Sequence, residues 1–386
     1  MARGVSLRAV YPIVVFLLDG LGDRAHDVLG GLTGNEAANT PNLDRLAARG
    51  SCGVLYAVGP GRAPSSEVAH WSLLGYRPDE FPGRAVFEAL GRGQDVSDEH
   101  VFAYAALRPA ERREDGWWLT GRPDPERDAE EAQRLVELCD GIELDGLTFS
   151  LAHVYRGEAI LRISGGADER VTDSDAFFRD RHPLLRPQPL VPEAERTARA
   201  CEEWTRQVIG RLEGARFNVI TLKWFGRPRA VPSFLERHGV TGAFAADSSF
   251  LRGLGLALGL QPVEAPETDD PVADLRGRAE LARQRLDAGD TFVFCHQKTT
   301  DAAGHTKDPR INGDPVPLLV AGPGVRADRV ERFGEADCAR GILGHLRGPD
   351  LMPVLLNAAD RPLFLGSRPT PFEGADGYPA LLERFR

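Results

Sequence analysis

The sequence predicts an α/β protein with a doubly wound, mainly parallel sheet and a smaller inserted α+β domain. The first observation is a continuous apolar run at 13–18, which is typical of a strand buried on both faces of a parallel sheet. It ends at Asp19. After a loop, Thr40 fits a helix N-cap, Pro41 fits the first turn and Gly50 would close the helix. Strand, loop and helix in this order indicate an α/β layer.

The second observation is a change of character in the middle of the chain. From about residue 100 to 235, charge, proline and arginine dominate, and the apolar stretches at 148–154 and 160–163 are short. We therefore expect a core formed by 1–100 and 236–386, with an inserted substrate-binding α+β domain at 101–235. Further strands are expected at 218–222, 291–295 and 316–321, and helices at 250–259 and 271–288.

Composition indicates an ordinary globular protein of the cytoplasm. The 386 residues are 42% hydrophobic and 27% charged, with a formal net charge of -10. This negative charge argues against nucleic acid as the main partner, whereas a local arginine cluster could still bind a small anion. No segment is long enough to span a bilayer, so no membrane partner is expected. The five cysteines form no CxxC pair and are expected to be reduced, buried thiols.

Two positions near the N-terminus are candidates for chemistry. Asp19 would lie at the carboxyl edge of the sheet, where open α/β sheets bind ligands, but it could equally be a solvated loop residue. Ser66 follows a Gly/Pro-rich loop at 59–64, and a helix starting there would place its hydroxyl beside free N–H groups that favour a phosphoryl group. The alternative is a plain serine helix cap.

A third candidate follows the predicted strand at 291–295. Asp301 and His305 are four residues apart, so from one helical turn they could reach one cation with oxygen and nitrogen ligands suited to Mn or Zn. Lys298, one of only three lysines in the chain, could pair with phosphate there. An isolated Asp-x3-His pair is otherwise more often ordinary surface polarity.

Taken together and in this order, these segments resemble the archaeal-type cofactor-independent phosphoglycerate mutases of the alkaline phosphatase superfamily. The resemblance spans nearly the whole chain. Its segments are 18–24, 36–44, 66–76, 83–91, 155–157, 162–165, 173–175, 232–234, 296–305, 313–317, 338–341 and 350–353.

The resemblance implies an alkaline-phosphatase-like fold and phosphoryl transfer with two divalent ions, Mn or Zn, with Mg as a further option. Ser66 matches the nucleophile that becomes phosphoserine, and Ser65 is the neighbouring alternative. Asp19 and Ser66 match ligands of one ion, and Asp301 and His305 match ligands of the other. Such ions would lower the pKa of the hydroxyl and neutralise the transferring group.

The resemblance also implies a small phosphorylated carboxylic acid as substrate, a step of glycolysis. Arg156 and Arg162 of the insert would hold this anion, because the forked guanidinium suits phosphate and carboxylate. His296 and Lys298, in the segment before Asp301, are the other expected substrate-binding residues.

The chain departs from the family pattern after His305. The family has a helix and a strand there, and that strand supplies an Asp-His pair to the first ion. Here the chain reaches Gly313 almost at once, and Ile311 stands where a last metal-binding His is expected. Three expected ligands are therefore missing, and Asp308 is one conceivable substitute. Smaller departures lie at 119–122, at Glu67 after the nucleophile and at 223–226.

Three functions follow. The first is a phosphoglycerate mutase that interconverts 2- and 3-phosphoglycerate, or a relative acting on another small phosphorylated or phosphonylated acid. The second is a catalytically inactive homologue that binds a phosphometabolite or a partner protein. The third is a single-metal phosphohydrolase in which Asp19, Ser66, Asp301 and His305 converge on one ion.

Overall fold

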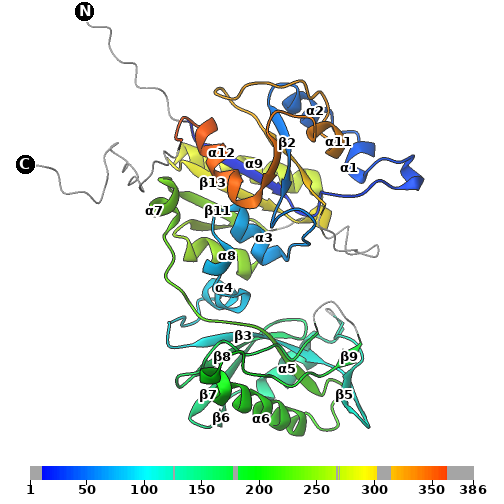
Figure 1. The fold of residues 1–386 in the computed structure, drawn as a ribbon, viewed down its shortest axis with the longest axis vertical. Coiled ribbons are helices and arrows are strands. Elements are labelled where there is room, and N and C mark those ends of the chain that lie inside the picture. The colour runs from blue at the N-terminus through cyan, green and yellow to red at the C-terminus, as the bar shows by residue number, and fades with distance from the viewer. Residues whose placement is uncertain are drawn as a thin grey trace, which may run out of the picture. The chain divides into compact units, whose positions relative to one another are not determined.

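The computed structural model describes residues 11–124, 127–176, 181–266, 268, 270–301 and 314–362 (Figure 1). The chain forms two compact units. The first comprises Met1–Phe81, Val231–Asp247 and Leu258–Arg386, and the second comprises Pro82–Ala230 and Ser248–Ala257. The domain boundaries expected from the sequence stay a prediction, because a compact unit is not by itself an independently folding domain.

The first unit contains a four-stranded sheet in which every pairing is parallel. The strand order is β1-β13-β11-β12, and α9 packs against β13 and β11. Pro271 occupies the first turn of α9, and the Asp270 side chain accepts hydrogen bonds from the N–H groups of Val272 and Ala273. The predicted α/β character is confirmed. The elements are β1 (Ile13–Leu18), β11 (Gly242–Ala246), β12 (Gln261–Glu264), α9 (Pro271–Asp287) and β13 (Phe292–Gln297).

Strand β1 is not buried on both faces, and in this respect the sequence expectation was wrong. Phe16 is 45% exposed, and among the described residues β1 pairs only with β13. Within the described residues the sheet therefore ends at β1. Leu17 instead packs against the cluster of Leu55, Leu73 and Leu351, of which Leu55 belongs to a separate sheet.

This separate sheet of the first unit has the order β14-β2-β15. β14 (Val316–Val320) runs antiparallel to β2 (Ser51–Tyr56), and β15 (Gly344–Arg347) runs parallel to it. The predicted strand at 316–321 exists, but as an edge strand it is only partly buried. The helical segments of the unit are η1 (Asp27–Leu29), α1 (Gly34–Ala37), α2 (Pro41–Ala47), α3 (Ser66–Leu73), η2 (Pro78–Glu80), α7 (Phe234–His238), α11 (Glu335–Cys338), η4 (Gly348–Asp350) and α12 (Leu351–Ala358).

The predicted helix start at Thr40 is only partly confirmed. Thr40 occupies the N-cap position and Pro41 the first turn of α2, but the Thr40 side chain makes no capping hydrogen bond. The helix ends at Ala47, before Gly50.

The second unit is an α+β structure with an antiparallel sheet of order β10-β3-β8-β7-β6. Helices α5 and α6 pack on this sheet, and Trp204 of α6 stacks on Phe149 of β7 with ring centroids 6.0 Å apart. The predicted strands near 148–154, 160–163 and 218–222 are confirmed. The elements are α4 (Arg84–Gly91), β3 (Val101–Arg108), α5 (Ala129–Leu138), β6 (Ile142–Leu144), β7 (Leu147–Tyr155), β8 (Glu158–Ser164), η3 (Pro192–Ala194), α6 (Glu195–Arg211), β10 (Val219–Gly226) and α8 (Ser249–Ala257).

A smaller three-stranded sheet completes the second unit, with order β4-β5-β9. Its strands are β4 (Ala110–Arg113), β5 (Gly116–Leu119) and β9 (His182–Pro183).

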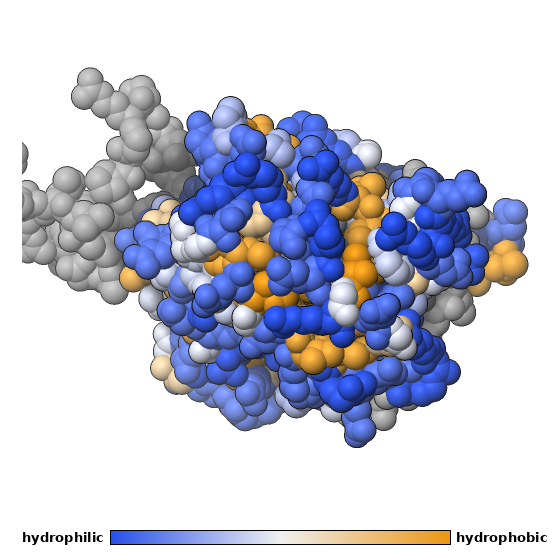
Figure 2. Space-filling model, turned by 90° about the horizontal axis from the view of Figure 1, so that it is seen from below, coloured by the Kyte–Doolittle hydropathy of each residue, from blue (hydrophilic) through white to orange (hydrophobic). Residues whose placement is uncertain are grey.

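Seen from below, the surface is largely hydrophilic, with hydrophobic residues showing in short strips between the polar ones (Figure 2).

The five cysteines are free and buried, as predicted from their spacing. Within the described residues, no helix is both long and apolar enough to cross a membrane.

Helices α4 and α8 touch through two glycines of the second unit. A Cβ added to Gly91 would lie 1.8 Å from the carbonyl oxygen of Ser249, and one added to Gly253 would lie 1.8 Å from that of Phe87. Both clashing atoms belong to the backbone, which cannot avoid the added Cβ by a change of rotamer as a side chain could. The absence of side chains at these two positions is therefore what permits the close helix crossing.

We expect Gly253→Ala to lower the free energy of unfolding of the second unit by about 1–3 kcal/mol, the usual cost of overpacking. Gly210→Ala on α6 is the matched control, because nothing lies within 4 Å of a Cβ there. That variant should be neutral or stabilising by up to about 1 kcal/mol, since alanine favours helix over glycine. Urea unfolding followed by circular dichroism would compare the two, and equal effects would contradict the proposed contact.

Candidate metal and phosphotransfer site

The carboxyl ends of β1 and β13 bring Asp19 and His296 together. The two strands pair in parallel with Leu17 opposite His296, so Asp19 follows directly beside that histidine. Its backbone N–H donates to the Gln297 carbonyl at 2.9 Å. His296 Nε2 lies 3.2 Å from Asp19 Oδ2. Since a carboxylate can only accept when it is ionised, Nε2 carries the proton in this contact.

His70 joins this pair from helix α3. Its ring centroid lies 5.1 Å from that of His296, and one ligand atom from each of Asp19, His70 and His296 lies within 4.8 Å of the other two. His70 Nδ1 donates to the Ser66 carbonyl at 2.7 Å, which leaves Nε2 with a lone pair. Burial lowers the pKa of His70 to about 4, so this imidazole is neutral near pH 7.

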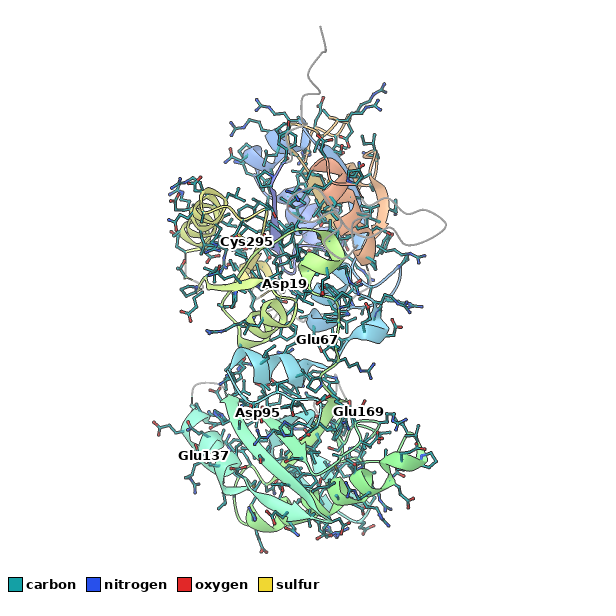
Figure 3. All side chains as sticks on the ribbon, turned by 90° about the vertical axis from the view of Figure 1, so that its left-hand side faces the viewer. Asp19, Glu67, Asp95, Glu137, Glu169 and Cys295 are labelled. Carbon is teal, nitrogen blue, oxygen red and sulfur yellow. The ribbon has the colours of Figure 1, made fainter. Side chains whose placement is uncertain are left out.

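Asp19 is ionised in this setting. Burial raises its pKa, but the hydrogen bond from His296 and, at the low pH where a carboxyl titrates, the charges of the two histidines more than offset this. The pKa of Asp19 therefore lies below its usual value. In the view of Figure 3, Asp19 lies between Cys295 of β13 and Glu67 of α3.

The backbone of Asp301 lies against the loop that carries Asp19. Gly20 has a φ of +74°, and a Cβ added there would come within 2.6 Å of the Asp301 Cα. Thr300 Oγ1 donates a short hydrogen bond to the Asp19 carbonyl. The structure thus places two of the predicted metal ligands side by side. The third, His305, lies outside the described residues.

Ser66 is the first residue of α3 and is exposed. Ser65 holds the N-cap position, and its side chain makes no capping hydrogen bond. Because His70 is bonded to the Ser66 carbonyl, the predicted nucleophile lies one helical turn from the Asp19–His70–His296 cluster. Lys298 directly follows β13 and is exposed.

The donor set of this cluster fits a divalent ion. One carboxylate and two imidazoles are ligands that zinc and similar transition metals accept. His296 Nδ1 is buried and has no hydrogen-bond partner within the part of the chain that the structure describes. A buried polar atom without a partner is rare enough in native proteins to require an explanation, and an absent ligand is one.

Arg156 and Arg162 belong to the second unit. Arg156 lies in the turn between β7 and β8, with its guanidinium 4.6 Å from the Tyr155 ring centroid, and has a φ of +56°. Arg162, on β8, has NH1 3.9 Å from Asp95 Oδ2. The two arginines therefore lie on the same hairpin.

A cationic cluster of the second unit surrounds Glu158. Burial raises the pKa of this carboxyl, although Arg156, Lys223, Arg84 and Arg122 act to lower it. Lys223 is only 5% exposed, its Nζ lies 4.6 Å from the Trp224 ring centroid, and burial lowers its pKa. Arg84 also pairs with Glu88, and Lys223 also faces Asp175, so the cluster contains acidic as well as basic side chains.

The position of His70 beside Asp19 and His296 was missed from the sequence. The available signal was its spacing of four residues from Ser66, which puts both on one face of a helix. The spacing alone could not show that the helix faces Asp19. Lys223 and Arg84 were also absent from the predicted substrate-binding set.

The sequence of this chain is similar to that of a known enzyme family. Residues 47–218 match the family model described as 2,3-bisphosphoglycerate-independent phosphoglycerate mutase. The phosphoglycerate mutase 2 of Methanocaldococcus jannaschii is 30% identical, over 92% of this chain and 95% of its own. The corresponding mutase of Methanoculleus marisnigri is 31% identical, over 90% and 97%.

Solved structures show the same likeness. A protein of Pyrococcus horikoshii has a TM-score of 0.73 at 26% identity, covering 93% of this chain and all of that one. The cofactor-independent phosphoglycerate mutase of Thermoplasma acidophilum has a TM-score of 0.61 at 26% identity, over 90% of this chain and all of that one. The chain is thus an α/β protein of the alkaline-phosphatase-like class. It belongs to the 2,3-bisphosphoglycerate-independent phosphoglycerate mutase family.

We expect Gly20→Ala to destabilise the first unit more than Gly31→Ala. Both glycines have positive φ, but only Gly20 has backbone atoms in the way of a Cβ. The control should cost about 1–2 kcal/mol for its left-handed backbone. The Gly20 variant should cost about 1–3 kcal/mol more for the clash with Asp301. Thermal unfolding measures both, and equal losses would show that Asp301 does not lie against this loop.

Proposed function

We propose that this protein is a phosphotransferase of the phosphoglycerate mutase type, which interconverts 2- and 3-phosphoglycerate through a phosphoserine at Ser66. The observation that supports it most is the convergence of Asp19, His296 and the Ser66–His70 turn at one sheet edge. Family membership supports the substrate, because the curated relatives are named as phosphoglycerate mutases.

In this proposal the Ser66 hydroxyl attacks the phosphorus and the bond to the glycerate oxygen breaks. The phosphoryl group rests on Ser66 until the other hydroxyl of glycerate attacks it, which restores the free serine. The N-terminal end of α3 favours the anionic group through its free N–H groups. Ser66 is exposed and can therefore reach a substrate.

A divalent ion would be held by residues of the first unit: Asp19, His70 and His296, with Asp301 adjacent. When bound, such an ion neutralises phosphoryl oxygens and lowers the pKa of a nearby hydroxyl. Ionised Asp19 and neutral His70 are both in the protonation state that a cation requires.

The anionic substrate would be bound in part by the second unit. Arg156 and Lys223 belong to the cationic cluster around Glu158, and Arg162 extends from the neighbouring strand. Guanidinium groups bind carboxylate and phosphate with two parallel hydrogen bonds. His296 and Lys298, at the end of β13, remain proposed substrate contacts from the first unit.

A single-ion phosphohydrolase is the second candidate. It is supported by the Asp19–His70–His296 group, whose ligand types could hold one ion. Release of inorganic phosphate from 3-phosphoglycerate, without formation of 2-phosphoglycerate, would identify this activity.

We expect Ser66→Ala to abolish the conversion of 3- to 2-phosphoglycerate, because no oxygen remains to accept the phosphoryl group. Ser65→Ala is the matched control and should keep most of the activity. An enolase-coupled assay measures turnover, and mass spectrometry of quenched enzyme locates the phosphoserine. Full activity of Ser66→Ala, or a phosphate found on Ser65, would contradict the assignment.

We expect Arg156→Gln to raise the KM for 3-phosphoglycerate by about 10- to 100-fold, the usual cost of a charged hydrogen bond. Arg134→Gln, at an exposed position of α5, is the control and should leave KM unchanged. Steady-state kinetics decides between them. An unaltered KM in the Arg156 variant would exclude this arginine as a substrate contact.

A further inference from the structure

Trp224 of the second unit has a backbone conformation that large side chains rarely adopt. Among the described residues, the non-glycine residues with positive φ are Asp145, Arg156, Trp224 and Asp360. Aspartate tolerates this conformation, whereas the φ of +56° at Trp224 marks strain in a bulky residue. Trp224 lies against Lys223, and the other bulky exception, Arg156, lies near Glu158. Strained residues of this kind cluster at functional sites, so the surroundings of Trp224 call for a functional explanation.

The neighbouring chain holds Trp224 in this conformation. The register of β10 on β3 shifts between Lys223 and Gly226, and Trp224 lies in this irregular stretch. Its N–H donates to Asp173 Oδ1 at 2.7 Å. A bulge in a strand re-aims a side chain, and here the indole lies over the Lys223 amino group.

The rings of Trp224 and Tyr104 lie next to two cations. The ring centroids are 5.5 Å apart. The Lys223 Nζ lies 4.6 Å from the Trp224 centroid and 5.5 Å from the Tyr104 centroid. The Arg84 guanidinium lies 5.9 and 5.3 Å from the same two centroids. All four distances are within the range of cation–π attraction.

An aromatic ring stabilises a cation differently from a carboxylate. A carboxylate binds individual N–H donors, whereas a ring attracts the charge through its face, so that the donors on the far side of an ammonium remain for oxygen atoms. Lys223 is only 5% exposed, and Asp175 and Glu158 also favour its charged form. The two rings thus fix the position of a buried cation without replacing the groups that it binds.

We propose that Trp224 is a positioning residue, which together with Tyr104 directs Lys223 toward a carboxylate or phosphate group of the substrate. Lys223 makes the contact with the anion, and Trp224 acts through Lys223. This inference rests on the function proposed above, which supplies the substrate. It gives a role to one of the positions at 223–226 where the chain departs from the family pattern.

The test removes the indole and follows both the kinetics and Lys223. We expect Trp224→Leu to raise the KM for 3-phosphoglycerate by about 3- to 30-fold, the range of a cation–π contact, with a smaller change in kcat. The pKa of Lys223 should fall, because the ring no longer favours the ammonium form. Trp224→Phe keeps a ring and should restore both values. Trp117→Leu is the matched control, because this tryptophan of the second unit has the Arg112 guanidinium over its ring instead.

The pKa of Lys223 can be measured by NMR of protein labelled with carbon-13 at the lysine Cε. The chain has only three lysines, and Lys223→Arg identifies the signal. An unchanged KM in Trp224→Leu would overturn the proposal, even if the variant is less stable. An unchanged pKa of Lys223 would overturn it as well, because Trp224 would then not act through this lysine. Trp224→Gly replaces the leucine variant if that one does not fold, since glycine suits a φ of +56° and the same results are expected.

Binding to the wild-type protein separates this inference from the proposed function. Addition of 3-phosphoglycerate should shift the Lys223 signal, and glycerol, which has no anionic group, should not. A shift in protein that does not interconvert phosphoglycerates would contradict the proposed function alone. An active enzyme whose Lys223 signal does not respond to 3-phosphoglycerate would overturn the role of Trp224 and Lys223 alone.

Discussion

The parallel pairing of β1 with β13 is the constraint on which the site depends. This register puts His296 opposite Leu17 and so places Asp19 beside the histidine ring. A shift of one residue would turn His296 to the other face of the sheet and separate the two side chains. The close approach of Asp301 to Gly20 is fixed by the same strand ends. The positions of these side chains are thus set by the backbone hydrogen bonds between β1 and β13.

The two units contain different groups of charged and titratable side chains. In the first, the ionised carboxylate of Asp19 lies beside the buried, neutral imidazole of His70, where attraction for a cation is stronger than in water. In the second, Lys223 and several arginines lie near the buried carboxyl of Glu158, with Glu88 and Asp175 as further acidic neighbours. The overall charge of -10 does not reveal this division.

Short sequence patterns predicted much of the fold. The features that they missed depend on packing between segments that are far apart in the sequence. The apolar run of β1 and the Pro271 start of α9 are encoded within a few residues, and both elements form where expected. The exposure of Phe16 was not predictable, because it depends on which strand lies beside β1. His70 was missed for the same reason: its spacing from Ser66 is local, but its position near Asp19 depends on packing between α3 and the sheet.

The open side of β1 has a consequence for the chain in crowded solution. The strand has the sequence IVVFLL, without the lysine, proline or bulge that usually protects an edge from other chains. Short uncharged segments of this kind are templates for intermolecular β-pairing whenever they are accessible during folding. Because β1 pairs on one side only among the described residues, we expect this chain to depend on rapid folding, or on chaperones that cover this edge, to avoid such pairing.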